Sequence, residues 1–411
     1  MRVLYFHQHF STPYGSTGTR SYEFAKKLVQ RGHEVTVVCG AHKGGDTGLT
    51  APFISARRAG EVEGFKVIEF QLPYSNNDKI LKRSVTFLKY SFQSVLVLWQ
   101  ESYDMVFATS TPLTAAIPGI IARWFKRKPF VFEVRDLWPE LPEAMGVIRN
   151  PFFLWVLSGL EWLSYHSANH IIGLSPGIEK GIEKRGVRKN KLRMIPNGCD
   201  LELFSPSSEE SPSKFELPGF SYFAVFSGAH GLANGLDQLL DVAIELKKAG
   251  RLDIGLLFVG DGFLKPELMR QAADKKLDNC VFLEPVTKIE LVEILRSATV
   301  GLMVLSDIPA FYYGTSPNKF FDYISSGLPV INNYSGWLAE LIKDNFCGAA
   351  VPAGDYKKFA AKIIEVCDND GVRAAMARSA RQLAESTFSR SELADEFADV
   401  LELVSQNKDP F

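Results

Sequence analysis

The sequence predicts an α/β protein built from two doubly wound parallel sheets, and three observations lead to this expectation. Short, continuous apolar runs alternate with helix-length segments along most of the chain. Strands of a parallel sheet read this way because helices cover both of its faces. A Ser- and Pro-rich stretch at 205–220 interrupts the alternation, and 411 residues exceed one ordinary core. We therefore expect two domains of similar size.

The first half supplies the elements of the first domain in order. The run "RVLYF" at 2–6 predicts a strand, a Gly-rich loop follows it, and "SYEFAKKLVQRG" at 21–32 predicts a helix that stops at a glycine. Further apolar runs predict strands at 34–39, 104–109, 129–134, 170–175 and 191–197. These elements define an expected first domain over residues 1–204.

The alternation restarts after the Ser- and Pro-rich stretch. Apolar runs predict strands at 222–228, 254–260, 281–285, 299–305 and 329–333. The end of the chain, 388–404, reads as a helix that Ser389 or Ser391 could cap. We expect a second domain over 205–387 and a C-terminal helix within 388–411. Ligands of open α/β sheets bind at the carboxyl ends of the strands, so the strand-to-helix loops should carry the function.

Composition excludes several classes of protein. A net charge of -1 gives no reason to expect a nucleic-acid partner. The five cysteines are scattered without paired metal spacing, which argues against structural zinc and a disulfide framework and suits a reducing cytosol. The N-terminal apolar run is too short for a signal peptide, and no stretch is long enough to span a bilayer. We expect a cytoplasmic protein.

Two apolar segments, 87–100 and 150–168, come nearest to a membrane composition but are interrupted by charged or polar residues. They predict amphipathic helices that either join the domain core or contact a membrane surface or lipid. The nearby "ARWFKRKPF" at 122–130 mixes cations with aromatic residues, which suits an anionic interface and equally a helix end entering a strand. A peripheral contact with the inner face of the cell membrane stays open.

Two loops of the first domain could carry chemistry. In "HQHFSTPYGSTGTR" (7–20), Gly15 and Gly18 allow close backbone approach, and the following helix offers its N-terminus to an anion. Arg20 could reach a phosphate or carboxylate, or simply cap the wall of a cleft. In "EVRDLWPE" (133–140), Arg135 and Asp136 follow a strand directly. They either form a salt-bridged turn or contact substrate, since charge at such a place is costly without a purpose.

Two loops of the second domain repeat the strand, glycine, helix pattern, and a third lies at a strand end with Thr287 as the expected N-cap. In "FSGAHGLANGLDQLLDVA" (226–243), Gly228 opens a second phosphate-cradle geometry, and His230 either contacts a phosphate or sugar or has no such role. Gly260 lies in a similar turn. The loop around Pro285 and Val286 could hold a planar base against backbone groups.

A fourth stretch, "SPNKFFDYISSGLPV" (316–330), places Lys319 and Asp322 three residues apart before an apolar strand. On a helix, this spacing puts both side chains on one face. They form either an ordinary surface ion pair or part of a ligand site, and the neighbouring glycine loops favour the site.

The order of these motifs resembles a known family. "GHEVTVVC", "IPNGCD" (195–200), the 226–243 loop and "PNKFFDYISSGLPVI" look like those of retaining GT-B glycosyltransferases of family four, which use nucleotide-sugar donors. "EVRDLWPE" and "SPNKFFDYISSGLPVI" look most like the bacterial branch that builds O-antigen and capsule chains, some of whose members transfer N-acetyl-L-fucosamine. The resemblance implies two Rossmann-like domains facing a central cleft. The first would bind acceptor, the second would bind donor, and the terminal helix would cross back to the first.

By this resemblance, Asp322 matches the acidic residue that binds the donor ribose, and Lys319 matches a cation near the donor phosphates. The sequence departs from the family pattern at three places. The partner acid expected eight positions before Asp322 falls on Gly314, the Arg and Lys of the 226–243 loop fall on Ala229 and Asn234, and the active-site His falls on Arg135. Lys319, Arg20 and Arg135 are then the candidates for neutralising phosphate charge.

The assignments can be stated residue by residue. The residues expected to bind the donor are Gly15, Gly18, Arg20, Gly228, His230, Asn234, Gly260, Pro285, Val286, Pro317, Asn318, Lys319 and Asp322. The residues expected to act in catalysis are Arg135, Asp136 and Lys319. No metal site and no cofactor are expected.

The resemblance implies a retaining transfer in which the acceptor attacks the face that the leaving group departs from. A phosphate oxygen of the donor then takes the acceptor's proton, and Asp136 orients the acceptor or assists. We expect fixed donors, Lys319 and helix N-termini to stabilise the departing diphosphate without a metal, since no Asp-x-Asp pair stands in a suitable loop. UDP is favoured by family frequency, and a lipid-linked saccharide is the expected acceptor.

Two other readings stay open. A GT-B sugar-nucleotide epimerase or phosphorylase would share the donor site, and an epimerase would convert donor without acceptor. A non-catalytic nucleotide-sugar binding protein or scaffold would bind donor without turnover, which the altered family positions make plausible. A dehydrogenase is disfavoured because neither predicted domain carries the G-x-G-x-x-G fingerprint.

Overall fold

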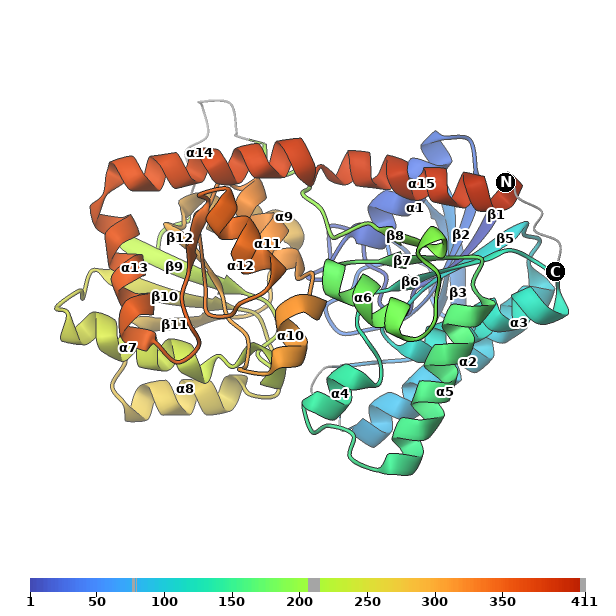
Figure 1. Cartoon of the computed structure of the whole chain (residues 1–411), viewed down its shortest axis with the longest axis horizontal. Helices are drawn as coiled ribbons and strands as arrows, with labels where there is room; N and C mark the ends of the chain where they lie inside the picture. Colours follow the sequence, from blue (N-terminus) through green and yellow to red (C-terminus); the bar gives the residue numbers. More distant parts are fainter. Residues whose placement is uncertain (76–77, 79, 206–214, 407–411) are drawn as a thin grey trace. The chain divides into compact units, whose positions relative to one another are not determined.

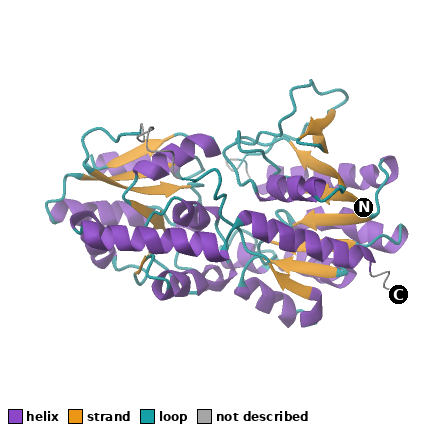
Figure 2. Ribbon diagram, turned by 90° about the horizontal axis from the view of Figure 1, so that it is seen from above, coloured by secondary structure: helices purple, strands orange, loops and turns teal. Residues whose placement is uncertain are grey.

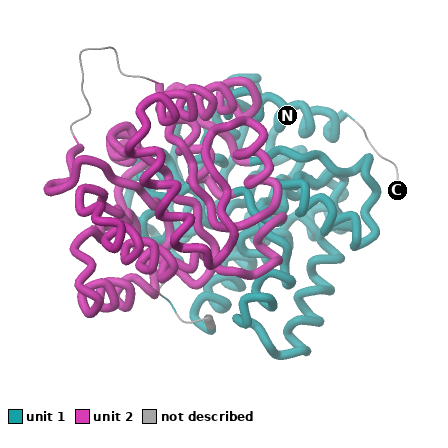
Figure 3. Tube along the Cα trace, turned by 60° about the vertical axis from the view of Figure 1, so that its left-hand side comes forward, with its two compact units in different colours: residues 1–196, 314–316, 390–411 teal, residues 197–313, 317–389 magenta. Residues whose placement is uncertain are grey.

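The computed structural model of the chain describes residues 1–75, 78, 80–205 and 215–406 (Figure 1). It divides into two compact units, coloured separately in Figure 3. The first unit is Met1–Pro196 with Gly314–Ser316 and Arg390–Phe411, and the second is Asn197–Tyr313 with Pro317–Ser389. The first segment of the first unit ends at Pro196, before the expected boundary at 204. Most of the expected linker, 206–214, lies outside the described residues.

An eight-stranded sheet forms the centre of the first unit, in the order β3-β4-β2-β1-β5-β6-β7-β8. Its strands are β1 (Arg2–Phe6), β2 (Glu34–Gly40), β3 (Arg57–Val62), β4 (Phe65–Phe70), β5 (Met105–Thr109), β6 (Phe130–Val134), β7 (His170–Gly173) and β8 (Leu192–Met194). All neighbours pair in parallel except β3, which pairs antiparallel with β4. The β3–β4 hairpin was missed at the sequence level because β3 alternates polar residues at a sheet edge.

Helices cover both faces of this sheet. They are α1 (Arg20–Gln30), α2 (Ile80–Gln100), η1 (Leu113–Ala116), α3 (Ile117–Phe125), α4 (Glu140–Ala144), α5 (Pro151–Ser167), α6 (Pro176–Lys184), η2 (Lys189–Lys191) and α15 (Arg390–Gln406). Alternate residues of β1 enter different cores, since Leu4 and Phe6 pack with α2, α3, α5 and α6, whereas Val3 and Tyr5 pack with α1 and α15. The C-terminal helix is thus part of the first unit's core.

The second unit has a six-stranded sheet, parallel throughout, in the order β11-β10-β9-β12-β13-β14. Its strands are β9 (Tyr222–Ser227), β10 (Ile254–Val259), β11 (Cys280–Leu283), β12 (Val300–Met303), β13 (Val330–Asn332) and β14 (Gly348–Ala350). The short β14 was also missed, because "GAA" has neither length nor β-branched residues. Figure 2 shows helices around the strands of each unit, which confirms two parallel-sheet α/β domains.

The helices of the second unit follow its strands in the predicted alternation. They are η3 (Leu232–Asn234), α7 (Asp237–Lys248), α8 (Lys265–Asp274), α9 (Lys288–Ser297), α10 (Pro309–Gly314), α11 (Asn318–Ser325), α12 (Trp337–Asp344), α13 (Tyr356–Asp368) and α14 (Asp370–Thr387). The carboxyl ends of the central strands β9, β10 and β12 therefore lead into the loops that precede η3, α8 and α10. The first two of these loops carry Gly228, His230 and Gly260 of the predicted donor residues.

Candidate active site

Glycines bring the loops after β9 and β10 into close contact. Gly228 and Gly260 have φ angles of +140° and +142°, a region that side chains rarely adopt. A Cβ on Gly260 would stand 2.0 Å from the carbonyl oxygen of Gly228, and one on Gly262 would stand 2.5 Å from the carbonyl oxygen of His230. The two backbones can therefore approach only because these positions have no side chain.

Lys319, from the first turn of α11, points onto this loop. Its ammonium donates a hydrogen bond to Oδ1 of Asn234 at 2.9 Å and lies 4.0 Å above the ring of Phe226. No carboxylate of the described residues lies within ion-pair distance of it, and burial lowers its pKa to about 7. The alternative of a surface ion pair between Lys319 and Asp322 is therefore wrong. The Lys319 ammonium has no carboxylate partner among the described residues.

Asn234 links this lysine to the loop backbone. Its amide nitrogen donates to the carbonyl oxygen of Ala229 at 2.7 Å, which leaves Oδ1 facing Lys319. Gly235 follows in the left-handed conformation, with a φ of 54°, and turns the chain into α7. The position where the family places a lysine thus holds an amide that orients another lysine.

Tyr323 ties α11 to the end of β9. Its hydroxyl accepts a hydrogen bond from the backbone N–H of Ser227 at 2.9 Å and donates to the carbonyl oxygen of Val225 at 3.2 Å. A Cβ on Gly301, in β12, would lie 2.5 Å from the Tyr323 ring, so that glycine makes room for it. These contacts fix the height of α11, and hence of Lys319, above the sheet.

Asp322 has a different environment from the one expected. Only 4% of it is exposed, and its Oδ1 forms an ion pair with Nζ of Lys288, the first residue of α9. The same ammonium lies 4.0 Å from Oδ2 of Asp200. The ribose role expected of Asp322 stays a prediction, and the structure adds a partner that the sequence pattern did not single out, since Lys288 neutralises the carboxylate.

His230 is fully buried among the rings of Phe226, Phe258 and Phe282, at centroid distances of 6.1 to 6.4 Å. Neither ring nitrogen has a hydrogen-bond partner among the described residues. Burial, followed by the nearby Lys265, lowers the pKa of this imidazole to about 4. It is a neutral ring that packs inside the unit and carries unused hydrogen-bonding capacity.

The remaining predicted donor residues lie at helix starts. Pro285 is exposed and Val286 half-buried, just before a capping box in which the side chain of Thr287 accepts from the N–H of Glu290. Pro317 precedes α11, and Asn318 is its first residue. The side-chain oxygen of Asn318 is buried without a hydrogen-bond partner among the described residues.

In the first unit, three adjacent strands end at one cluster. His7 follows β1, Ser110 and Thr111 follow β5, and Arg135 and Asp136 follow β6. The Arg135 backbone N–H donates to the Ser110 hydroxyl at 2.9 Å, and its guanidinium lies 3.4 Å from Nε2 of His7. Sheet order alone brings these residues together, since β1, β5 and β6 are neighbours.

The cluster has shifted titration properties. Burial, the largest cause, together with Arg135, His9 and His42, lowers the pKa of His7 well below its ordinary value. Burial raises the pKa of Asp136, whereas Arg135 and the Thr111 hydroxyl, 3.4 Å from its Oδ2, oppose that rise. His7 is therefore neutral, and it was missed because the sequence reading concentrated on the glycines of its loop.

Arg20 is a structural residue. Its buried guanidinium pairs with Glu133 at 2.7 Å and donates to the carbonyl oxygens of Ile195 and Pro196. Glu133 in turn accepts a hydrogen bond from Thr109. The phosphate role expected for Arg20 is therefore wrong, because its donors are used inside the unit.

The glycines beside Arg20 also serve packing more than ligand approach. A Cβ on Gly15 would lie 2.2 Å from Oγ of Ser11 and 2.8 Å from the backbone nitrogen of Asp46, so Gly15 fits this loop against a neighbouring turn. Gly18 is half-buried one residue before Thr19, the N-cap of α1. The first loop is therefore filled by its own chain, and no anion cradle is left where Gly15 was expected to form one.

A pocket with a cavity volume of about 370 Å³ lies in the first unit. It is lined by Ala41, His42, Lys43, Pro73, Tyr74, Ser75, Asp78 and Lys82. The His9 ring contacts two of these side chains, with centroids 5.4 Å from His42 and 4.5 Å from Tyr74. Polar and aromatic walls of this kind suit a saccharide.

Comparisons with known proteins give this architecture its class. Residues 15–198 match the family described as glycosyl transferase 4-like domain, and residues 222–369 match the family described as glycosyl transferases group 1. Together the two matches span most of the chain. The chain belongs to the GT-B glycosyltransferases of family four.

Curated relatives are distant. A D-inositol 3-phosphate glycosyltransferase of Nocardiopsis dassonvillei is 26% identical over 233 residues, 53% of this chain and 52% of the relative. The O-antigen chain mannosyltransferase C of Escherichia coli is 23% identical over 246 residues, 59% of this chain and 62% of the relative. The chain spans about half the length of the curated relatives it matches.

Solved structures resemble the chain over its full length. Sucrose-phosphate synthase from Thermosynechococcus elongatus has a TM-score of 0.78 at 16% identity, covering 98% of both chains. HepE from Anabaena, solved with UDP and glucose, has a TM-score of 0.72 at 17% identity and covers 98% of this chain and 100% of its own. These likenesses establish the GT-B fold.

Proposed function

We propose that the protein is a retaining, metal-independent glycosyltransferase that moves a sugar from a UDP-linked donor to a lipid-linked saccharide during O-antigen or capsule synthesis. The sugar would be a hexose or N-acetylhexosamine, and the motif resemblance favours N-acetyl-L-fucosamine. The enzyme would act at the inner face of the cell membrane, where such an acceptor is anchored. The second unit, which holds most of the predicted donor residues, would bind the donor. The first unit would bind the acceptor.

The observation that carries this proposal is the unpaired cation of Lys319. A half-buried ammonium without a carboxylate is costly, and a diphosphate would relieve that cost while gaining a strong electrostatic partner. Gly228 leaves the approach to this ammonium free of a side chain, since a Cβ there would lie 3.5 Å from Nζ. Lys319 would therefore stabilise the charge that develops on the departing nucleoside diphosphate.

The acceptor side would use the first unit. The acceptor hydroxyl oxygen forms a bond to the anomeric carbon, the bond from that carbon to the phosphate oxygen breaks, and this oxygen takes the hydroxyl proton. Asp136 would orient the hydroxyl from the end of β6, with Arg135 held beside it by Ser110. The pocket around His42 and Tyr74 would hold the preceding sugar.

UDP is the first nucleotide to test as the donor's leaving group. HepE, which shares the fold, is described in complex with UDP-glucose and with UDP and glucose. GDP is the main competitor, because a Corynebacterium glutamicum relative, 26% identical over 218 residues, is named as GDP-mannose-dependent. We propose that the nucleotide base of the donor binds at the loop of Pro285 and Val286.

A thermal-shift panel of UDP, GDP, dTDP and CMP tests the donor site, with Lys319→Met and Asp322→Asn beside the native chain. Binding raises the melting temperature by mass action. We expect a rise with UDP that Lys319→Met abolishes. A rise that is equal in Lys319→Met would remove the observation on which the proposal rests.

Asp322→Asn separates two roles. If Asp322 binds the ribose beside its Lys288 partner, the variant loses the UDP shift in addition to apo stability. If Asp322 only neutralises Lys288, the apo protein loses about 3–5 kcal/mol of stability, as when one partner of a buried pair is removed. The UDP shift is then retained, and the ribose assignment is dropped.

Turnover distinguishes the alternatives. Mass spectrometry of donor incubated without acceptor, with acceptor, and with EDTA separates epimerase, transferase and metal-dependent reactions. Near-normal transfer by both Lys319→Ala and Asp136→Asn would contradict the mechanism. UDP binding without any conversion of donor would favour the non-catalytic alternative.

A further inference from the structure

Helix α2 turns its apolar side toward solvent. Leu81, Val85, Leu88, Phe92, Leu96 and Trp99 recur at spacings of three and four residues and are all exposed. The buried side of the same helix includes Tyr90, Val97 and Leu98, together with Thr86, Ser91 and Ser94. A helix that served only the domain core would carry polar residues on its exposed side. The exposed stripe of α2 therefore needs an explanation outside the fold.

Helix α5 also presents apolar residues to solvent. It exposes Phe152, Phe153, Trp155, Val156, Trp162 and Leu163. It buries Glu161, Ser164, Tyr165 and Ser167, and the Glu161 carboxylate pairs with Arg185 at 2.8 Å. Two helices of the first unit thus present aromatic residues to solvent, while their inner faces include polar residues.

The short helix α3 joins the two stripes. It packs against both α2 and α5. Lys126, at its end, lies 4.6 Å over the ring of Trp99 on α2, and the indole of Trp124 donates to the Ser167 hydroxyl of α5 at 2.9 Å. Figure 1 shows the three helices together on the first unit. The exposed residues of α2, α3 and α5 form one surface, which we call the aromatic face.

Tryptophan is concentrated on this face. Four of the six tryptophans of the chain, Trp99, Trp124, Trp155 and Trp162, lie on it and are 51 to 73% exposed. Exposed apolar residues scattered singly are normal, but a contiguous aromatic surface marks an interaction site. Tryptophan and phenylalanine beside cations are typical of a protein surface that rests in a membrane interface.

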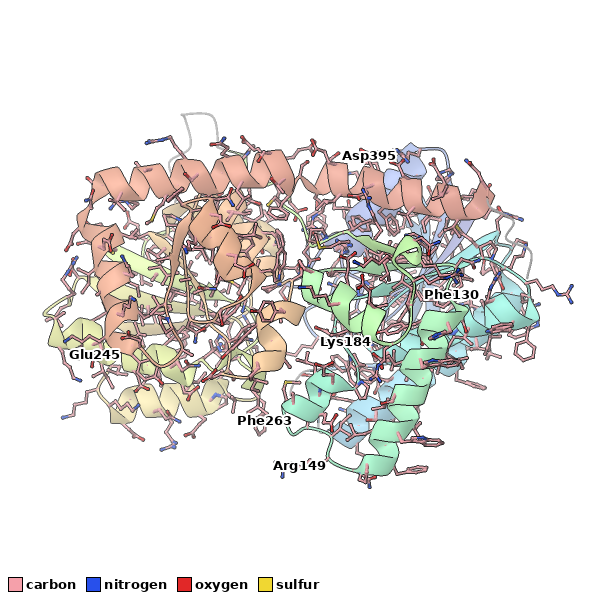
Figure 4. The ribbon with its side chains drawn as sticks, in the orientation of Figure 1. Phe130, Arg149, Lys184, Glu245, Phe263 and Asp395 are labelled. Carbon is pink, nitrogen blue, oxygen red and sulfur yellow. The ribbon has the colours of Figure 1, made fainter. Side chains whose placement is uncertain are left out.

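The charge of the aromatic face is predominantly basic. Its helices and their flanks carry Arg83, Lys89, Arg123, Lys126, Arg127, Lys128 and Arg149, whereas Lys82 pairs with Asp78 and Glu101 follows α2. Figure 4 labels Arg149 near the start of α5. From 80 to 100, 117 to 129 and 149 to 167 the sequence has a single acidic residue, the buried Glu161, although the whole chain is balanced at 46 basic and 47 acidic residues. An anionic surface is therefore the complementary partner.

We propose that the aromatic face docks the first unit onto an anionic phospholipid bilayer, with the aromatic rings at headgroup depth and the cations against lipid phosphates. The contact is peripheral, since no helix of the described residues has the length and hydropathy to cross a bilayer. Attraction of each cation to anionic lipid adds to the burial of the rings, so binding depends on both.

The test is sedimentation with vesicles of phosphatidylcholine alone and with phosphatidylglycerol added, without nucleotide or acceptor. The result is then independent of the proposed transferase activity. We expect the native chain to pellet with the anionic vesicles and its tryptophan emission to shift to the blue. The variant Phe92→Ser/Phe153→Ser/Trp155→Ser should lose at least about tenfold in vesicle affinity without unfolding, because these side chains are exposed.

Matched controls lie in the second unit. Leu252→Ser/Phe263→Ser/Phe346→Ser removes three equally exposed apolar side chains elsewhere and should bind vesicles as the native chain does. Lys89→Glu/Arg149→Glu should lose the preference for phosphatidylglycerol, whereas Lys357→Glu/Lys358→Glu, on α13, should keep it.

Several outcomes would overturn the proposal. The native chain could fail to pellet with either vesicle, or both triple variants could bind equally well. A dimer in light scattering that the first triple variant dissociates, together with no vesicle binding by the native chain, would assign the face to a second copy instead.

Discussion

Two glycine-rich loops look alike in the sequence and differ in the structure. The first, at 7–20, leads into α1 and Arg20, and the second, at 226–235, lies under Lys319 of α11. Arg20 is fully enclosed and paired with Glu133, whereas Lys319 has an amide and an aromatic ring but no carboxylate among the described residues. One cation is satisfied by its own fold, and the other is not.

The difference teaches how to separate an anion site from a structural cation. Glycine, a helix start and a basic residue occur in both loops, so the local pattern carries no distinction. What distinguishes them is whether a buried carboxylate lies within reach, and Glu133 comes from a strand 113 residues away. Charge pairing, which depends on the tertiary fold, decides which loop can attract a phosphate.

The largest effect should come from Arg20→Met. Removing the guanidinium leaves Glu133 buried without its cation, which costs about 3–5 kcal/mol of unfolding free energy. Urea unfolding measures this loss, and the UDP shift of the folded protein should persist. Loss of UDP binding at unchanged stability would restore Arg20 to the donor site and erase the contrast.

Lys319→Met should act in the opposite way. Removing a fixed positive charge at the departing phosphate should lower kcat/KM by about 10²–10³-fold, the loss typical of a missing electrostatic stabiliser. The melting temperature of the apo protein should stay the same or rise, because burial already disfavours the charged lysine. Steady-state kinetics beside a thermal melt measures both. A large fall in stability would make Lys319 a structural cation like Arg20.

Alanine at the glycines should sharpen the comparison with a smaller effect. Gly228→Ala adds a strained φ and a methyl group 3.3 Å from Cε of Lys319, so we expect about 1–2 kcal/mol of stability lost and weaker UDP binding. Gly15→Ala collides with Ser11 and the Asp46 backbone and should destabilise the protein without weakening UDP binding. Titration calorimetry on both variants separates the two loops.

The smallest expected effect is the uptake of a fraction of a proton when UDP binds. The pKa of Lys319 is lowered to about 7 in the free protein, and bound phosphate oxygens should raise it again. UDP binding at pH 8 should therefore take up part of a proton, and affinity should fall as the pH rises above 7. Calorimetry in two buffers of different ionisation enthalpy measures the uptake, which Lys319→Met should remove. Uptake that is equal in the variant belongs to another group.

The same lowered pKa predicts the direction of a stability change. Because the folded pKa of Lys319 lies below its unfolded value, the unfolded chain binds more protons between about pH 7 and pH 10.5. The contribution of Lys319 is fully present above that window and is lost as the pH falls to about 7. Lys319→Met should flatten this part of the stability curve.

Sequence reasoning predicted the two parallel sheets because their strands are continuous apolar runs, such as β9 and β10. It missed the β3 edge strand, whose residues alternate, and β14, which has only three residues. Within the site it selected Lys319 and Asp322 from a motif but did not find the cation that pairs with Asp322. The partner Lys288 lies 34 residues earlier and meets Asp322 only in the fold.

The cluster at the ends of β1, β5 and β6 shows the same limit. Arg135 and Asp136 were chosen because charge follows a buried strand directly, and that signal is local. His7 and Thr111 could have been found by one further step, since they follow the strands that a doubly wound sheet places beside β6. The exposure of α2 and α5 was undecided because an apolar stripe looks the same whether it faces a core or solvent.

The placement of α15 has a consequence for the order in which the chain can fold during synthesis. Phe397 stacks on Phe24 with ring centroids 4.4 Å apart, and Leu401 lies in the same core as Val3 and Tyr5. While the ribosome is still making the second unit, the first lacks this helix, and α1 alone cannot complete the core on that face of the sheet. Residues of β1 and α1 can therefore reach their final burial only after α15 has been synthesised and has left the ribosome.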